Sequence, residues 1–286
     1  MVVIAKEIKN TVGTIYVQEK EEWFPAGTGF FISEPHPSKE KEFFVYFVTA
    51  KHVIAGEEKI RIKLSQDKEG GKEPFIDYNL NPTVTFCHEG NKAVDIILLP
   101  IILKERDNVK QVILERKMFA TKKVREEQGM MEGDEILFIG MMPGLTGREK
   151  NPSIVRHGKL ALLTNEESEI YEGDDYKGKA NLIYGEIATF GGSSGSPVFL
   201  RRNGMNLKGG NWHIEPDRFW LLGIMGGYVP TLGKVKRKEE KTELLAELNS
   251  HIGFIIPTDY IEDILRSSKA EEFRTGKIPL KMDVVW

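Results

Sequence analysis

The sequence predicts an all-β protein, built as a sandwich or a barrel, and three observations carry this prediction. Short runs of apolar, β-branched and aromatic residues recur along most of the chain, and each run has the length of a strand. The segments between these runs are rich in Gly, Pro, Asn and charged residues, which is typical of turns and loops. The pattern lacks the alternation of strands and helices that builds a parallel sheet. A length of 286 residues suits two domains or one large all-β unit.

Each expected strand is one of these runs, and each expected loop is one of the polar segments between them. In chain order, the strands cover residues 29–32, 43–48, 60–64, 83–87, 96–99, 135–139, 159–163, 198–200, 220–225 and 253–256. The main loops cover residues 34–42, 66–73, 145–152, 164–179 and 201–217.

Two charged segments interrupt the strand pattern. Residues 103–128 can hold a short helix or the connection between two halves of the protein. Residues 236–248 are rich in helix formers, and Leu244, Leu245 and Leu248 would share one side of a helix. We therefore expect a helix over this second segment.

The C-terminal part of the chain is also expected to be helical. Residues 258–266 follow Pro257 and carry apolar side chains at helical spacing, and Thr258 or Asp259 is suited to cap the helix. The final segment, 271–286, is expected to be a docked or mobile tail, and its last residues, 284–286, are expected to anchor it on the body of the protein, with partner binding as the alternative.

Composition excludes several function classes. Lys and Arg number 40 against 43 Asp and Glu, so no basic face for nucleic acid is expected. A single cysteine, Cys87, allows neither an internal disulfide nor a cysteine-based zinc site, and the histidines have no metal-ligand spacing, so we expect no metal and no other cofactor. The longest apolar run, 96–103, is too short to cross a bilayer, and the first residues lack the apolar stretch of a signal peptide. These features predict a cytoplasmic protein without membrane contact.

The motif FGGSSGSPVF at residues 190–199 is the strongest chemical signal in the sequence. Acyl transfer needs a turn that exposes a serine hydroxyl and aims backbone N–H groups at one point, and glycine permits such a turn. In this motif Ser194 is the candidate nucleophile, and the N–H groups of Gly192 and Ser194 are the candidate oxyanion donors. The alternative is a Gly/Ser-rich hairpin loop without chemistry.

A serine nucleophile needs a base, and His52 and Asp95 are the candidates. His52 lies in FVTAKHVIAG, where an apolar strand ends, and Asp95 opens the apolar run DIILLP. An Asp among apolar residues needs a partner, and it is suited to accept the imidazole Nδ1–H and fix the tautomer. Taken singly, His52 could be a histidine at a strand end and Asp95 a turn residue.

The order His52, Asp95, Ser194 is that of the chymotrypsin-type triad, and the sequence here resembles the trypsin-like serine peptidases. The motifs that carry the resemblance are VTAKHV, VDIILL and GGSSGSPVF around the three residues, together with GTGFFI at 27–32, GDEILFIGMMPG at 133–144, LLGIMGG at 221–227 and IGFIIP at 252–257. The GSSGSPV form is most similar to disulfide-poor bacterial members, the glutamyl endopeptidases and the HtrA-type peptidases.

The resemblance implies two six-stranded antiparallel β-barrels with a C-terminal helix. Residues 10–115 would form the first barrel with His52 and Asp95, and residues 130–258 the second with Ser194. Residues 258–286 would form the helix and tail. The implied mechanism is acylation of Ser194 with His52 as base and then acid, followed by hydrolysis.

The resemblance also implies a substrate pocket without charge. Its residues would be Ala188 and Thr189 at the base, Gly226, Gly227 and Tyr228 along the substrate backbone, and Gly253 on an open opposite wall. No acid is available for Lys or Arg, and Met225 stands where glutamyl peptidases place a histidine. A small or medium apolar side chain is therefore expected at the cleaved position.

Regulation is expected to differ from that of secreted zymogens, because Ser193 stands where those members carry an acid. The insertion 231–250 follows the substrate strand and is a candidate regulatory loop, with an ordinary charged surface loop as the alternative. HtrA-type members carry a PDZ domain after the peptidase, and the residues after the last expected helix are too few for one. Any regulator would then be a separate protein or a ligand.

The expected function is that of an intracellular serine endopeptidase acting on protein or peptide substrates. The alternative is a catalytically silent binding or scaffold module on the same fold. A serine esterase of another fold is disfavoured, because the histidine would then come last in the chain.

Overall fold

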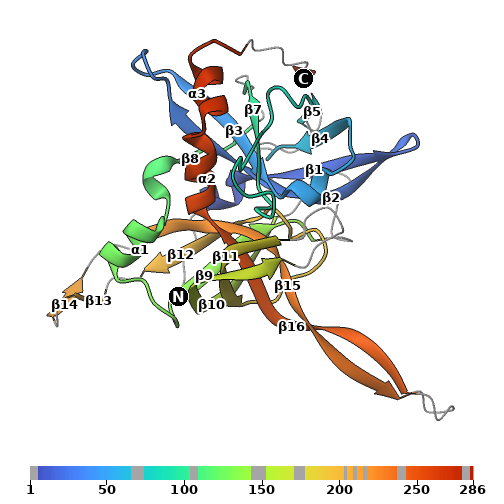
Figure 1. The fold of residues 1–286 in the computed structure, drawn as a ribbon, viewed down its shortest axis with the longest axis vertical. Coiled ribbons are helices and arrows are strands. Elements are labelled where there is room, and N and C mark those ends of the chain that lie inside the picture. The colour runs from blue at the N-terminus through green and yellow to red at the C-terminus, as the bar shows by residue number, and fades with distance from the viewer. Residues whose placement is uncertain are drawn as a thin grey trace.

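The computed structural model describes residues 6–65, 74–103, 109–142, 153–170, 178–202, 205–208, 211–214, 218–236, 243–278 and 284–285. Its strands form one large sheet from the N-terminal part of the chain and one closed ring from the C-terminal part, which lie one above the other in Figure 1. The predicted all-β class is confirmed, with short helices beside the two sheets.

The N-terminal sheet has nine strands and is open. These are β1 (Val12–Glu19), β2 (Glu22–Pro35), β3 (Phe43–Thr49), β4 (Lys59–Lys63), β5 (Phe75–Asn79), β6 (Phe86–Cys87), β7 (Ile97–Ile101), β8 (Leu114–Glu115) and β17 (Val284–Val285). The strand order is β17-β5-β4-β1-β2-β3-β7-β6, and β8 pairs with β2 in parallel while the other pairs are antiparallel.

The expected six-stranded first barrel is therefore corrected to an open sheet. The strand predicted over 83–87 shortens to β6, because Pro82 has no N–H and Asn81 accepts the N–H of Thr83 at 2.9 Å in a turn. No ladder joins β5 to β6 in the described residues. The edge of β5 is paired instead by β17, which confirms that the end of the chain docks on the body.

The C-terminal ring is a closed barrel of six strands, as predicted. They are β9 (Glu135–Gly140), β10 (Ile154–Ile170), β11 (Gly178–Glu186), β12 (Pro197–Arg202), β15 (Arg218–Lys236) and β16 (Glu243–Pro257). A separate hairpin joins β13 (Met205–Lys208) and β14 (Asn211–Ile214).

Strands β15 and β16 continue beyond the ring as a long two-stranded arm (Figure 1). The helix predicted over 236–248 is wrong for residues 243–248, which lie in β16 and pair with 231–236 of β15. Helix propensity is a weak preference, and pairing that continues an existing ladder outweighs it. Residues 237–242 lie outside the described part.

The described helical segments are short. They are the 3₁₀ turns η1 (Lys6–Thr11), η2 (Lys51–Ile54) and η3 (Arg116–Met118) and the helices α1 (Lys122–Gln128), α2 (Thr258–Leu265) and α3 (Ser268–Arg274). The short helix allowed within 103–128 is α1, and the predicted C-terminal helix is α2.

The predicted cap of α2 is wrong. Pro257 occupies the N-cap position, and no side chain caps this helix. The Asp259 carboxylate instead accepts the Lys122 N–H at 2.6 Å and an Arg125 N–H at 2.7 Å, which ties α2 to α1. Thr258 is fully buried.

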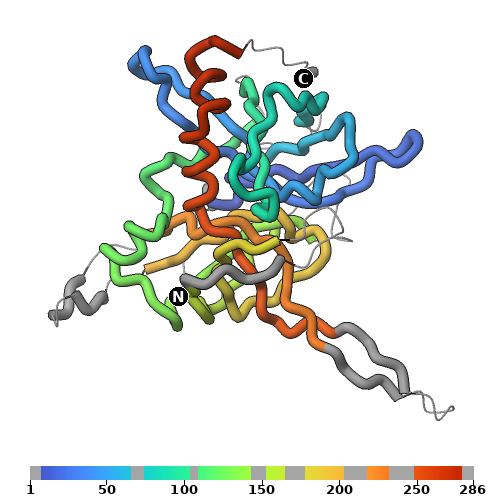
Figure 2. Tube along the Cα trace, in the orientation of Figure 1, coloured from blue at the N-terminus to red at the C-terminus, as the bar shows by residue number. Residues whose placement is uncertain are grey.

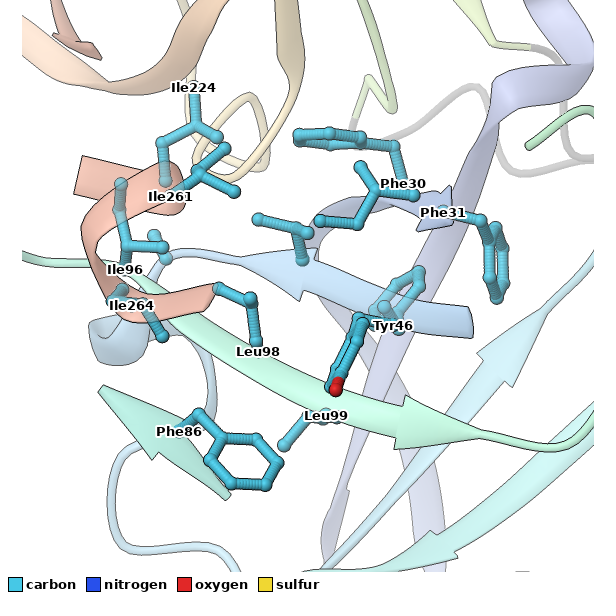
Figure 3. Packing of buried hydrophobic residues seen from close by; sticks show 14 of the residues in the cluster. Phe30, Phe31, Tyr46, Phe86, Ile96, Leu98, Leu99, Ile224, Ile261 and Ile264 are labelled. Atoms are coloured by element: carbon cyan, nitrogen blue, oxygen red, sulfur yellow. The ribbon is translucent and has the colours of Figure 1, made fainter. Parts of the chain in front are cut away.

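Helices α2 and α3 connect the two halves through a continuous hydrophobic core. Ile261 and Ile264 of α2 lie between Ile224 of the ring and the side chains of β7 and its approach (Figure 3). Figure 2 shows the chain after residue 257 leaving the ring and running along the N-terminal half. There Phe273 of α3 packs against Phe86, with ring centroids 5.3 Å apart. The two halves are thereby held in one position relative to each other.

Candidate active site

His52 and Asp95 come together because the strands that carry them are neighbours. His52 lies in η2, just after β3, and Asp95 lies just before β7. Since β3 and β7 are antiparallel and Thr49 pairs with Ile97, the end of one strand faces the start of the other. The sequence-predicted pair is therefore brought into direct contact.

Both carboxylate oxygens of Asp95 are used by His52. The His52 backbone N–H donates to Oδ1 at 3.0 Å, and Nδ1 of the ring lies 2.5 Å from Oδ2. Asp95 is 1% exposed, so its charge needs these partners, whereas a quarter of the His52 side chain is open to solvent. Donation from Nδ1 makes Nε2 the basic nitrogen of a neutral ring.

Lys51 and Cys87 lie beside this pair. Lys51 Nζ donates to the carbonyl oxygen of Lys92 at 2.7 Å, and burial lowers the pKa of its amine while the Cys87 and Asp95 charges oppose the shift. Burial raises the pKa of the Cys87 thiol, which disfavours the reactive thiolate. Cys87 is half-buried.

Ser194 lies in a tight double turn between β11 and β12. The Ser193 N–H donates to Phe190 O at 3.0 Å, and the Ser196 N–H donates to Ser193 O at 3.1 Å. Gly192 has φ +84° and Gly195 has φ +81°, values that side chains with a β-carbon rarely adopt. The glycines of the motif are thus needed for the shape of this loop.

The two predicted oxyanion donors have no acceptor within the part of the chain that the structure describes, since no hydrogen bond from the N–H of Gly192 or Ser194 occurs there. The Ser194 hydroxyl donates to the carbonyl oxygen of Gly226 at 3.2 Å. Ser194 therefore lies against the β15 segment that was predicted to bind the substrate backbone.

Gly27 joins the histidine and serine segments. A β-carbon on Gly27 would lie 2.5 Å from the Val53 side chain and 3.2 Å from the Ser194 carbonyl oxygen. The next residue, Thr28, donates its N–H to that same oxygen at 3.0 Å. Val53, the residue after His52, and Ser194 thus both approach strand β2 at Gly27.

Of the residues predicted to form the substrate pocket, Gly226 contacts Ser194 directly, through its carbonyl oxygen. Ala188 is half-buried, Thr189 is buried, and Gly226 packs so closely on the Phe254 ring that a β-carbon would lie 2.2 Å from it. Gly227 and Tyr228 follow along β15, and Tyr228 is exposed.

Gly253 is the residue expected to leave the opposite wall of the pocket open. Gly253 is buried, and a β-carbon there would meet the side chains of Ile187, Thr189 and Met225, each at 3.2 Å. These three side chains fill the space in front of Gly253.

Three residues near the site had no assigned role from sequence. Asn249, at the base of the arm, donates to the Thr189 carbonyl oxygen at 2.7 Å, and the Arg156 guanidinium stacks 4.4 Å from the Phe190 ring. No local pattern in the sequence marks these contacts. Thr28 lies in the GTG motif, and its hydroxyl between two glycines is the only local feature in the sequence that points to a role for this residue.

Within the described residues, no group of three or more His, Cys, Asp or Glu side chains is arranged to hold a metal ion. None of the helices described here is long and apolar enough to span a membrane.

The described strands form two β units, with His52 and Asp95 carried by the first and Ser194 by the second, and comparison with known proteins gives the family. The model of the trypsin-like peptidase domain matches residues 27–205, more than half of the chain. The protein belongs to the trypsin-like peptidase domain family.

Solved structures share the fold at low identity. The protease domain of MamO from Magnetospirillum magneticum is 12% identical, with a TM-score of 0.53, over 92% of this chain and 100% of that chain. The Rv3671c protease from M. tuberculosis in its active form is 15% identical, with a TM-score of 0.50, over 91% of this chain and 82% of that chain. A comparison with curated protein sequences gives no match.

Proposed function

We propose that the protein is a serine endopeptidase that hydrolyses peptide bonds through an acyl-enzyme on Ser194. The observation that carries the proposal is the buried Asp95 carboxylate bonded to the His52 ring at 2.5 Å, beside a loop with two N–H groups that have no acceptor in the described chain. A base with an orienting carboxylate and a preformed oxyanion site are what acyl transfer requires.

The mechanism starts when the Ser194 hydroxyl turns from Gly226 O toward His52. Nε2 of His52 takes its proton as Oγ attacks the carbonyl carbon, and Asp95 stabilises the resulting imidazolium through Nδ1. The N–H groups of Gly192 and Ser194 bind the developing oxyanion. His52 then gives its proton to the leaving amine, and water repeats the sequence to release the acid and restore Ser194.

We propose protein or peptide substrates with a small or medium apolar residue on the acyl side of the cleaved bond. The pocket residues Ala188 and Thr189, with Met225 beside them, carry no charge. Gly226, Gly227 and Tyr228 would pair with the substrate backbone as an added strand. A peptide library should give cleavage mainly after apolar residues, and a profile led by Arg, Lys or Glu would contradict this preference.

A silent binding module is the second candidate, and one observation favours it. The single proton of the Ser194 hydroxyl is donated to Gly226 O, so it is not simultaneously donated to His52. In an active peptidase, the hydrogen bond from Ser194 to Gly226 O is a resting state. Binding of substrate, a regulatory protein or a ligand then turns the Ser194 hydroxyl toward His52. We also propose that the peptidase is located in the cytoplasm and that a partner or ligand regulates it.

Labelling with a fluorophosphonate probe separates the two candidates. The unaltered protein should react, whereas Ser194→Ala and His52→Ala should not, because the nucleophile and its base act as a unit. Ser38→Ala is a control, since Ser38 is an exposed serine in the loop between β2 and β3. If labelling is absent, or equal in Ser194→Ala and the unaltered protein, with and without peptide substrate, the silent module is the better account.

A further inference from the structure

We propose that Thr28 is a positioning residue for acyl transfer, holding the two carbonyl groups on either side of the Ser194 N–H. This inference rests on the proposed peptidase function and extends it to a residue outside the triad, the oxyanion donors and the pocket. Thr28 lies in β2 of the N-terminal sheet, whereas the loop that it holds leads into β12 of the ring.

Thr28 makes two hydrogen bonds to the nucleophile loop. Its hydroxyl donates to the Gly192 carbonyl oxygen at 3.1 Å, and its backbone N–H donates to the Ser194 carbonyl oxygen at 3.0 Å. The carbonyl between them, that of Ser193, accepts the N–H of Ser196 at 3.1 Å. Three consecutive carbonyl groups of the loop are therefore fixed, two of them by Thr28.

The remaining bonds of Thr28 fix its own position from both halves of the molecule. The hydroxyl accepts the Met141 N–H at 3.0 Å, just after β9 of the ring. The Thr28 carbonyl accepts the Thr49 hydroxyl at 2.8 Å, three residues before His52. Thr28 and Thr49 are both fully buried. The hydroxyl thus donates once and accepts once, and water does not reach it.

Holding carbonyl groups determines where the N–H groups point, because each peptide unit is planar. The Ser194 N–H shares its peptide unit with the Ser193 carbonyl, which the Ser196 N–H holds from within the loop, and Thr28 holds the carbonyls of the peptide units before and after it. Gly192 has φ +84° and no β-carbon to restrict it. The peptide unit after Gly192 is held from within the loop by the bond from the Ser193 N–H to Phe190 O, and from outside the loop by the Thr28 hydroxyl.

The space around the loop shows how closely this contact is built. A β-carbon on Gly195 would lie 2.1 Å from the Thr28 carbonyl oxygen and 2.4 Å from the Thr49 hydroxyl. The loop is therefore seated directly on Thr28 and Thr49. Valine at position 28 would keep the shape of the side chain and lose the bond to Gly192, together with the bond from the Met141 N–H.

Three variants of the full chain test the role. Thr28→Val has nearly the same shape and lacks the hydroxyl, whereas Thr28→Ser retains it. Thr11→Val is the matched control, because Thr11 is also buried and its hydroxyl donates to a carbonyl, that of Ile8 at 2.8 Å, away from the site. For each we would measure kcat and KM on a peptide cleaved by the unaltered protein, and the thermal unfolding midpoint.

A pair of ligands reports on the oxyanion site separately from substrate binding. A peptide aldehyde adds the Ser194 oxygen to its carbonyl carbon reversibly, and its oxygen takes the oxyanion position. The matching product peptide binds the same cleft without forming such an adduct. A role in orienting the N–H groups predicts weaker binding of the aldehyde only.

We expect Thr28→Val to lower kcat about 10- to 100-fold, less than the ~10²- to 10³-fold typical for removal of an oxyanion donor. KM and product binding should stay within about 2-fold, aldehyde binding should weaken about as much as kcat, and Thr28→Ser should recover most of the loss. Thr11→Val should lower the unfolding midpoint and leave kcat unchanged.

Two results would overturn the assignment while the proposed function stands. One is a Thr28→Val protein with the kcat and aldehyde affinity of the unaltered enzyme. The other is a loss in Thr11→Val equal to that in Thr28→Val, which would make the effect one of stability. A protein with no Ser194-dependent turnover or labelling overturns the peptidase function, and the assignment with it.

Discussion

The two halves of the molecule prepare their parts of the candidate site in different ways. The N-terminal sheet contributes His52 and Asp95, whose side chains already contact each other, with the carboxylate buried and both of its oxygens bonded. The C-terminal ring contributes Ser194 on a loop shaped by backbone conformation, with glycines at φ +84° and +81°.

This difference indicates which changes each half tolerates. In the N-terminal half, the proposed proton transfer depends on side-chain atoms of His52 and Asp95. Replacing one polar atom, with the shape of the side chain unchanged, is therefore enough to prevent it. In the ring it depends on where backbone N–H groups point, so adding a β-carbon at a glycine is the equivalent change. The boundary between the two halves is bridged by Thr28, Met141 and the helices α2 and α3.

The largest effect is expected for Asp95→Asn. Asparagine has nearly the same shape, but it presents an N–H₂ group where the His52 ring needs an acceptor, and this favours the wrong tautomer. We expect kcat to fall on the order of 10³- to 10⁴-fold with little change in KM, measured by steady-state peptide hydrolysis. Asp77→Asn, in β5 of the same sheet, is the control and should retain full turnover at pH 7. Equal turnover in Asp95→Asn and the unaltered protein would show that the carboxylate has no catalytic role.

A smaller effect is expected for Gly192→Ala in the ring. Alanine disfavours φ near +84° by about 1–3 kcal/mol, so the peptide should relax and misdirect the N–H of residue 192. We expect a loss in kcat of about 10- to 100-fold. Gly133→Ala is the matched control, since Gly133 has φ +90° with no atom near its missing β-carbon. It should destabilise the protein by a similar amount and leave kcat unchanged. If the two variants lose kcat equally, strain in the fold and not the oxyanion site explains the loss.

The sequence predicted the ring, α2 and the contact of His52 with Asp95 better than it predicted the N-terminal sheet. Patterns of apolar residues indicate strands. The candidate site needs particular residue types, and the motifs around His52, Asp95 and Ser194, with their order in the chain, indicate those residues. Closure of the N-terminal sheet would need a ladder between β5 and β6, which the described residues do not form, and Pro82 and the Asn81 turn shorten β6 to two residues.

Contacts between distant segments explain the other differences. Residues 243–248 have helix-forming side chains, but a ladder that begins in the ring extends through them. The bonds from Thr28 to Gly192 and from Asn249 to Thr189 join residues 164 and 60 positions apart, and no local pattern encodes them. Gly253 illustrates the same limit, because the three side chains nearest its missing β-carbon come from two other segments, residues 187–189 and Met225 of β15.

The smallest expected effect concerns the stability of the N-terminal half in acid. In β5, Asp77 accepts Arg61 Nε at 2.6 Å and Nη2 at 2.9 Å, and these bonds, with Lys59 at 3.1 Å, hold the pKa of the Asp77 carboxyl below its usual value. Because the folded pKa is lowered, the stabilisation is complete above the unfolded value of about 3.9 and disappears as the pH falls through the folded value.

Asp77→Asn should therefore lower the free energy of unfolding by about 1 kcal/mol or less at pH 7, and the difference from the unaltered protein should shrink toward zero below pH ~4. Denaturant titrations at several pH values measure this difference. Hydrogen exchange at pH 7 locates it, because amides of β4 and β5 should exchange faster in the variant while those of the ring stay protected. A difference that is constant with pH would rule out titration of Asp77 as its cause. Equal loss of protection in the ring would show that the two halves unfold as one unit. The hydrophobic core that they share through α2 would then couple their unfolding, although their strands form two separate sheets.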